Sequence, residues 1–157
     1  MDTIYLTQGG YDKLFEELEL LKNVKRRELS KRIAEARAQG DLSENAEYDA
    51  AKEAQAQLEG KITQLETKLA NSQILSHDQI SLDKVNIGVK VSLKDLGSGD
   101  EFAYTILSDE EADYEHDQIG INSPVAQGLL GKAKGETAEI HAPRGLFKYK
   151  VLDISLP

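Results

Sequence analysis

The sequence contains no cysteine and no tryptophan, and it has only three phenylalanines and three prolines. Without cysteine the chain can form neither a disulfide framework nor a thiolate zinc site. The three histidines, His77, His116 and His141, lie far apart in the sequence and lack the spacing of metal ligands. The sequence therefore predicts neither a cross-linked scaffold nor a histidine metal site.

Long apolar segments are also missing. No run of apolar residues approaches the roughly 20 that span a bilayer, and no apolar segment of the signal-peptide type follows the N-terminus. We therefore expect a cytoplasmic protein that has no membrane partner. The 157 residues are enough for one domain or two small ones. A net charge of −9 argues against a protein that coats nucleic acid indiscriminately.

Composition divides the chain into two parts, and together they predict an α+β protein. Residues 11–38 and 43–74 are rich in Leu, Ala, Glu, Lys and Arg, which predicts two long helices. Beyond them, short β-branched runs at 89–93, 102–107, 136–141 and 147–154 predict strands, with a hairpin turn at 97–100. A short helix is expected at 124–130, because Ser123 can cap it, Pro124 suits the first helical position and Gly131 can end it. We assign residues 1–75 to a helical hairpin, 76–78 to a linker and 79–157 to a second domain.

The apolar spacing predicts that the two helices pair in antiparallel fashion. In the second helix, apolar positions step alternately by three and four residues, as in a coiled-coil seam. Pairing places Leu14 opposite Leu69 and puts the reversal near residue 42. A four-residue skip near Leu29 and Ile33 predicts that the seam unwinds there. At a rise of 1.5 Å per residue, the arm would be about 45 Å long.

The string Gly40-Asp-Leu-Ser-Glu-Asn-Ala-Glu-Tyr48 places two carboxylates, Asp41 and Glu44, at the apex of this hairpin. Their spacing fits a capping box, with Asp41 as N-cap, Glu44 at the third helical position and Gly40 ending the first helix. Alternatively, both carboxylates point outward and bind a hard divalent cation. Two carboxylates hold Mg²⁺ poorly by themselves, because the ion keeps most of its waters or takes further oxygen ligands. The second interpretation therefore needs another molecule that supplies those ligands.

The first helix also carries a concentration of basic side chains, and the only acidic residues among them are Glu28 and Glu35. These basic residues are Lys22, Lys25, Arg26, Arg27, Lys31, Arg32 and Arg37. A run of this kind is usually a solvated helix face. Its significance depends on what the acidic tip does.

The tip string, followed by Ala50-Ala51-Lys52-Glu53, resembles the hairpin tip of the Gre-type bacterial transcript cleavage factors, in particular the GreA-like branch. The resemblance covers the whole chain and includes Asn122-Ser-Pro-Val-Ala126. It implies a coiled-coil arm followed by an FKBP-like α+β domain. It also implies a transcription elongation factor that binds backtracked bacterial RNA polymerase and works as a monomer.

According to this resemblance, the arm enters the secondary channel of the polymerase and brings Asp41 and Glu44 to the active site. There the two acids would help to hold the second catalytic Mg²⁺, which is shared with the polymerase and not stably bound by the factor alone. The polymerase would then hydrolyse the nascent RNA 3′ end with its own two-metal site. We therefore expect a factor that is not itself an enzyme.

The resemblance further assigns contacts with RNA to basic residues on both helices. Arg37 and Lys52 flank the tip, and a second group lies farther back on the first helix. That group consists of Arg26, Arg27, Lys31 and Arg32.

In the second domain, Ser123, Pro124 and Val125 match a patch that faces the polymerase at the rim of the channel. The sequence departs from the family pattern in two places. Gln127 stands where a basic residue is usual, and Lys148 and Lys150 lie in a strand that is commonly more acidic.

Two other functions are compatible with the same architecture. A channel-occupying inhibitor of RNA polymerase would share the fold, but such relatives tend to carry additional tip acids, and this tip adds only Glu47. An unrelated coiled-coil adaptor would use the tip acids only as caps. A free-standing Mg²⁺ nuclease is disfavoured, because no further ligand cluster accompanies the two acids in the sequence.

Overall fold

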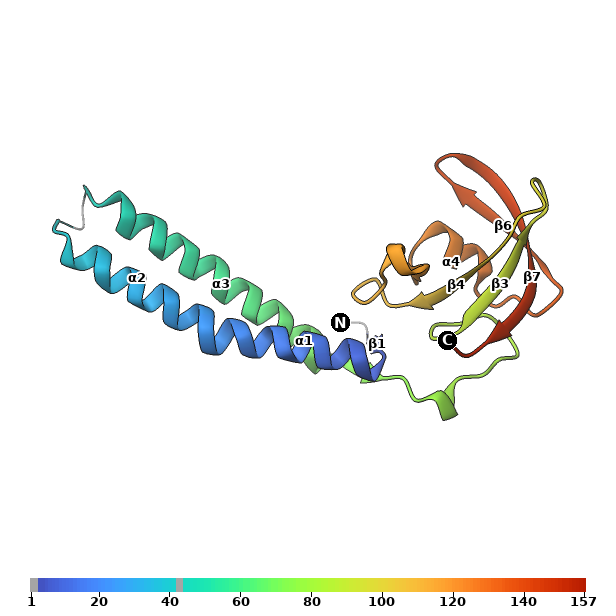
Figure 1. The fold of residues 1–157 in the computed structure, drawn as a ribbon, viewed down its shortest axis with the longest axis horizontal. Helices are drawn as coiled ribbons and strands as arrows, with labels where there is room; N and C mark the ends of the chain where they lie inside the picture. The colour runs from blue at the N-terminus through green and yellow to red at the C-terminus, as the bar shows by residue number, and fades with distance from the viewer. Residues whose placement is uncertain (1–2, 42–43) are drawn as a thin grey trace. The chain divides into compact units, whose positions relative to one another are not determined.

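The computed structural model of the chain describes residues 3–41 and 44–157 (Figure 1). Contacts between residues divide them into two compact units. The first contains residues 9–72, and the second contains residues 3–8 together with 73–157. Within the described residues, no helix has both the length and the apolar character needed to cross a membrane.

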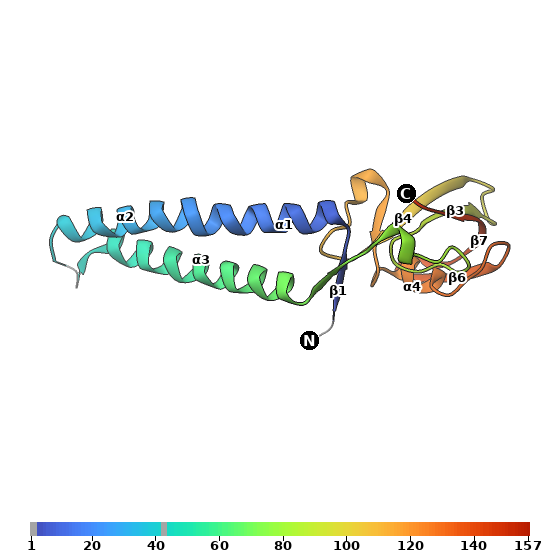
Figure 2. The same cartoon turned by 90° about the horizontal axis from the view of Figure 1, so that it is seen from below.

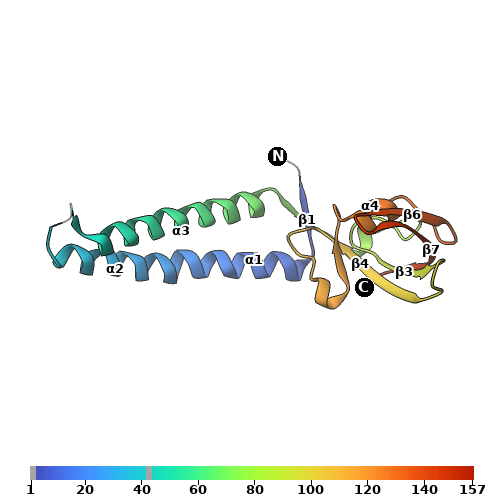
Figure 3. The same ribbon diagram turned by 90° about the horizontal axis from the view of Figure 1, so that it is seen from above.

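The first unit is a helical hairpin. Helix α1 (Gln8–Leu20), a π-helical turn η1 (Leu21–Lys25) and helix α2 (Arg26–Ala38) follow one another without a break. Helix α3 (Ala46–Ala70) returns alongside them, as Figures 2 and 3 show from two sides. The predicted reversal near residue 42 and the predicted helix start at Ser43 fall on positions 42 and 43, outside the described residues.

A narrow apolar seam holds the two sides of the hairpin together, as predicted from the spacing. Its buried members are Leu18, Leu58, Ile62 and Leu65, with Leu14, Leu21, Leu29 and Leu69 half-buried against them. Nearer the tip the seam continues through Ile33, Ala36 and Ala51. Burial of one Leu or Ile side chain contributes about 1.5–3 kcal/mol. The hairpin therefore depends on a single row of contacts.

The predicted unwinding near Leu29 and Ile33 is wrong in position. Helix α2 is regular there, and the irregular turn is η1, which precedes α2. A π-helical turn accommodates one additional residue. The four-residue skip in the apolar spacing reflects the same additional residue. Lys25 is a polar residue at a nominal seam position, and it is the last residue of this turn. Its side chain is 51% exposed, and its Nζ lies 3.6 Å from Glu28 Oε2.

An ion pair crosses the hairpin directly after the π turn. Arg26 Nε and Nη2 donate to the two carboxylate oxygens of Glu59 at 2.8 and 2.9 Å. The hydrogen bond between the two side chains lowers the pKa of Glu59 and raises the pKa of Arg26. The stabilisation is present above the ordinary pKa of Glu59 and is lost as the pH falls through the lowered value. Both side chains are half-buried, with exposed fractions of 42% and 47%, so solvent screening keeps the contribution of the pair to stability small.

The second unit contains a five-stranded sheet in the order β5-β4-β3-β7-β6. Strands β4 and β5 are parallel, and the other neighbours are antiparallel. The strand bounds are β3 (Lys90–Asp95), β4 (Glu101–Leu107), β5 (Gln118–Gly120), β6 (Thr137–Ala142) and β7 (Gly145–Ser155). These strands and helix α4 (Pro124–Leu129) confirm the α+β class and the predicted short helix. Strand β5 was not predicted, and the turn η4 (Tyr114–His116) lies between β4 and β5.

Helix α4 packs against the sheet and closes the core of this unit. The fully buried side chains include Leu93, Ile106, Leu129, Ile140 and Val151. Gly128 permits the close approach of α4 to β6, because a Cβ at this position would lie 2.6 Å from Ile140 Cδ1.

The structure groups residues 3–8 with the second unit, whereas the sequence interpretation assigned residues 1–75 to the hairpin. Strand β1 (Ile4–Leu6) pairs with β2 (Ser72–Ile74), and the Thr7 N–H donates to the Glu111 carboxylate at 3.1 Å. The Thr7 hydroxyl donates to the same carboxylate. The predicted linker at 76–78 overlaps the turn η3 (His77–Gln79).

We expect Ile62→Ala to destabilise the hairpin by about 2–4 kcal/mol, because Ile62 is 1% exposed at the centre of the seam and its loss leaves a cavity. Leu20→Ala is the matched control, because Leu20 is 51% exposed on the same hairpin. Urea unfolding followed by circular dichroism at 222 nm measures both changes. Equal midpoints for the two variants would contradict the assigned seam.

Candidate functional site

The tip of the hairpin begins where α2 ends. Gln39 is the C-cap residue of α2, and Gly40 follows with φ +132°, a value that side-chain-bearing residues rarely adopt. This confirms the prediction that Gly40 ends the first helix. Asp41 and Glu44 lie on either side of the undescribed positions 42 and 43, and both are exposed.

The predicted capping box is wrong. Asn45 is the N-cap of α3, its Oδ1 accepts a hydrogen bond from the Tyr48 N–H at 3.1 Å, and the helix begins at Ala46. Asn and Asp are about equally good N-caps, so the preference for position 45 comes from elsewhere in the tip. Neither Asp41 nor Glu44 serves as the N-cap of α3.

Two contacts cross between the helices directly below the acids. Asn45 Nδ2 donates to the Ala36 carbonyl oxygen at 2.6 Å. This carbonyl belongs to the last turn of α2 and also accepts a hydrogen bond from the Gln39 N–H at 3.2 Å. The Arg37 guanidinium carbon lies 5.8 Å from the centroid of the Tyr48 ring, within the range of a cation–π contact. We call these four residues, Ala36, Arg37, Asn45 and Tyr48, the neck of the tip.

The tip is strongly acidic. Glu47 and Asp49 lie in the first turn of α3, where negative charge interacts favourably with the helix dipole. Asp41 and Glu44 add two exposed carboxylates just before that turn. Carboxylate oxygens are the ligands that Mg²⁺ prefers, although the ion takes six oxygen ligands in near-octahedral geometry. Across residues 3–41 and 44–157, no three or more His, Asp or Glu side chains gather as a metal site. The two acids thus fit part of a coordination shell.

The structure separates the predicted RNA-binding residues into two groups. Arg27, Lys31 and Arg32 are exposed along α2. Others already have partners within the hairpin. Arg26 is paired with Glu59, and Lys52 Nζ donates to Gln55 Oε1 at 3.1 Å. The bidentate pair gives Arg26 a structural role that the sequence did not indicate.

The predicted polymerase-facing patch lies at the start of α4. Ser123 is the N-cap, and its Oγ accepts from the Ala126 N–H at 3.2 Å. Pro124 is exposed at the first turn, whereas Val125 is half-buried against the core. Of the three, Pro124 therefore presents the most accessible surface.

A hydrogen-bonded latch holds the loop that leads into this patch. Asp109 accepts from the Asn122 N–H at 3.2 Å and from Asn122 Nδ2 at 2.7 Å. Gln127 Nε2 donates to the Ile121 carbonyl oxygen at 2.8 Å, so this unusual residue has a local structural function. Lys148 and Lys150 are exposed on β7, and nothing in the structure explains their departure from the family pattern. Sequence reasoning missed Asp109 because its partner lies 13 positions away.

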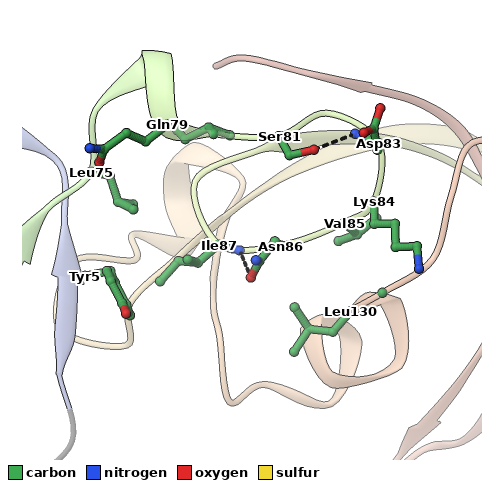
Figure 4. A pocket seen from close by; sticks show the side chains of 12 residues that line it. Tyr5, Leu75, Gln79, Ser81, Asp83, Lys84, Val85, Asn86, Ile87 and Leu130 are labelled. Carbon is green, nitrogen blue, oxygen red and sulfur yellow. Dashed lines mark hydrogen bonds between the residues drawn. The ribbon is translucent and has the colours of Figure 1, made fainter.

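The second unit also contains a hollow of about 790 Å³ (Figure 4). Tyr5, Leu75, Ile87 and Leu130 supply part of its lining. None of the residues predicted to contact metal, RNA or polymerase lines it. The tip and the α4 patch therefore remain the candidate sites.

Comparison with known proteins identifies the family. Residues 4–74 match the N-terminal domain, and residues 79–156 the C-terminal domain, of the GreA/GreB transcription elongation factors. Transcription elongation factor GreA of Prosthecochloris aestuarii is 50% identical to this chain, covering 98% of it and 97% of the relative. The GreA of Chloroherpeton thalassium is 49% identical, with coverages of 99% and 98%. The chain belongs to the GreA/GreB family of transcription elongation factors.

Among solved structures, GreA factor homolog 1 of Thermus thermophilus aligns with 97% of this chain and 98% of its own, at 27% identity and a TM-score of 0.45.

We expect Asn45→Ala to destabilise the hairpin by about 1 kcal/mol, the usual effect of a lost N-cap. Glu44→Ala should change stability less, because Glu44 lies before the N-cap. Urea unfolding at 222 nm, together with hydrogen exchange of the Tyr48 amide, measures the difference. If Glu44→Ala had the larger effect, the assignment of the cap to Asn45 would be wrong.

Proposed function

We propose that this chain binds bacterial RNA polymerase during elongation and stimulates cleavage of the nascent RNA 3′ end by the polymerase. One observation carries the proposal: a member of an elongation-factor family presents two exposed carboxylates, Asp41 and Glu44, at the end of a long helical hairpin. Neither acid caps the following helix. Both are exposed, so their oxygens can reach a ligand outside the chain.

The two carboxylates suit a hard divalent ion that other groups also hold. Mg²⁺, when bound, makes a water more acidic and offsets charge that develops on the leaving oxygen. Asp41 and Glu44 would supply negatively charged oxygen ligands, and the polymerase and the RNA would supply the others. The hydrolysis belongs to the polymerase in this proposal, so the chain acts as a factor and not as a nuclease.

The exposed basic side chains of α2 suit contacts with the RNA backbone. Arg27, Lys31 and Arg32 are available, and Arg37 and Lys52 stand beside the tip. Such contacts with phosphate groups position the RNA without reading its sequence, and they weaken with salt. Arg26 is the least suited of the predicted group, because Glu59 already accepts both of its hydrogen bonds.

The second unit would hold the factor on the polymerase through Ser123, Pro124 and Val125. The Asp109–Asn122 latch keeps the loop before this patch in place. We propose that one monomer acts on one polymerase, in the cytoplasm where transcription occurs. A factor that fills the channel without stimulating cleavage would bind through the same patch, so cleavage assays separate the two functions.

We expect Asp41→Asn and Glu44→Gln each to lower the cleavage rate of a backtracked elongation complex at least tenfold. Each amide keeps one oxygen but loses the negative charge that Mg²⁺ requires. Loss of a residue that merely supports a metal ligand typically costs about 10–100-fold. Thermal unfolding and competition with the unmodified factor for polymerase should remain unchanged.

The matched control is Glu47→Gln, which makes the same chemical change in the first turn of α3. This variant should cleave at a rate close to that of the unmodified factor. Full activity of the Asp41→Asn/Glu44→Gln double variant would remove the basis for a role in metal binding.

We expect Pro124→Ala to raise the factor concentration that gives half-maximal cleavage, with the maximal rate unchanged. Alanine is compatible with the first position of α4, so the fold should be retained. Pro143→Ala makes the same change at another exposed position of this unit and should have no such effect. An unchanged half-maximal concentration for Pro124→Ala would place the docking surface elsewhere.

A further inference from the structure

Asn45 links both ends of the acidic tip through one side chain. Its Oδ1 accepts from the Tyr48 N–H of α3, and its Nδ2 donates to the Ala36 carbonyl of α2. We propose that Asn45 is a positioning residue, whose carboxamide fixes the neck and so determines where Asp41 and Glu44 are presented. This inference rests on the function proposed above.

Capping alone does not account for asparagine at this position. Serine, threonine and aspartate also cap helices. An ionised aspartate has no hydrogen to donate, and the shorter serine side chain cannot bond Tyr48 and Ala36 from opposite ends. An amide supplies an acceptor and a donor at the same time. The combination of the two bonds is therefore specific to the carboxamide.

The acceptor of the Asn45–Ala36 hydrogen bond lies in a well-packed part of the hairpin. Ala36 is 3% exposed and Ala51 is fully buried, so the seam holds the end of α2 directly below the tip. The Asn45–Ala36 hydrogen bond is itself partly buried and only 2.6 Å long. Its acceptor therefore belongs to a packed part of the hairpin.

The Asn45–Ala36 hydrogen bond affects both acids, because both lie close to its two ends in the sequence. Glu44 is joined to Asn45 by one peptide bond, and Asp41 directly follows Gly40 at the end of α2. Loss of the Asn45–Ala36 hydrogen bond would give Asp41 and Glu44 more conformational freedom. Two ligands of one ion must be held in a productive geometry, so this freedom lowers the rate without weakening docking.

The test compares Asn45→Ser with Asn71→Ser in the full-length protein. Serine at position 45 keeps an N-cap oxygen and adds no charge, but it removes the donor to Ala36. Asn71 is the matched control, because its Nδ2 donates to the Thr67 carbonyl at 2.9 Å at the other end of α3. Two measurements are made: amide order parameters of Asp41 and Glu44 by nuclear magnetic resonance, and cleavage by a backtracked polymerase over a range of factor concentrations.

For Asn45→Ser we expect lower order parameters at both acids and a maximal cleavage rate reduced at least fivefold, with an unchanged half-maximal concentration. Asn71→Ser should alter neither quantity. Unchanged order parameters or an unchanged maximal rate in Asn45→Ser would overturn the positioning role. An unmodified factor that stimulates no cleavage would instead overturn the proposed function, and the order parameters would still decide whether Asn45 organises the tip.

Discussion

The hairpin depends on one narrow row of apolar contacts between two antiparallel helices. Large side chains such as Leu18 and Ile62 fill this seam toward its base, and Ala36 and Ala51 replace them near the tip. Because alanine is small, the helices end close enough for one asparagine side chain to bridge them. The Arg26–Glu59 pair joins the two helices between these two regions. Apolar packing, one ion pair and one side-chain bridge therefore hold the two helices together.

Charge is distributed along this arm in a way that suits an ion and a polyanion. Acids cluster at the tip, where the start of α3 favours negative charge. Exposed arginine and lysine side chains follow along α2, which suits RNA phosphates. Asn45, and neither Asp41 nor Glu44, is the N-cap of α3. Both carboxylates are exposed, as the proposed function requires.

Periodicity was sufficient to predict the helices, the seam and the apical position of the acids. It could not identify the cap, because Asp41 and Asn45 are equally competent in sequence and only the distant Ala36 carbonyl favours one of them. The apolar spacing showed that the first helix contains one additional residue, but it did not show which turn contains that residue. Strand β5 and the Thr7–Glu111 contact depend on partners remote in the sequence, 104 residues away in the second case. Local patterns contain no signal for either.

In the proposed function, the tip acids help to hold an ion at the polymerase active site. The Mg²⁺ dependence of RNA cleavage by a backtracked elongation complex, with and without saturating factor, tests it most directly. If the acids supply ligands, the factor should lower the Mg²⁺ concentration that gives half-maximal cleavage. An unchanged Mg²⁺ requirement, whatever the maximal rate, would show that the acids do not help to bind the ion.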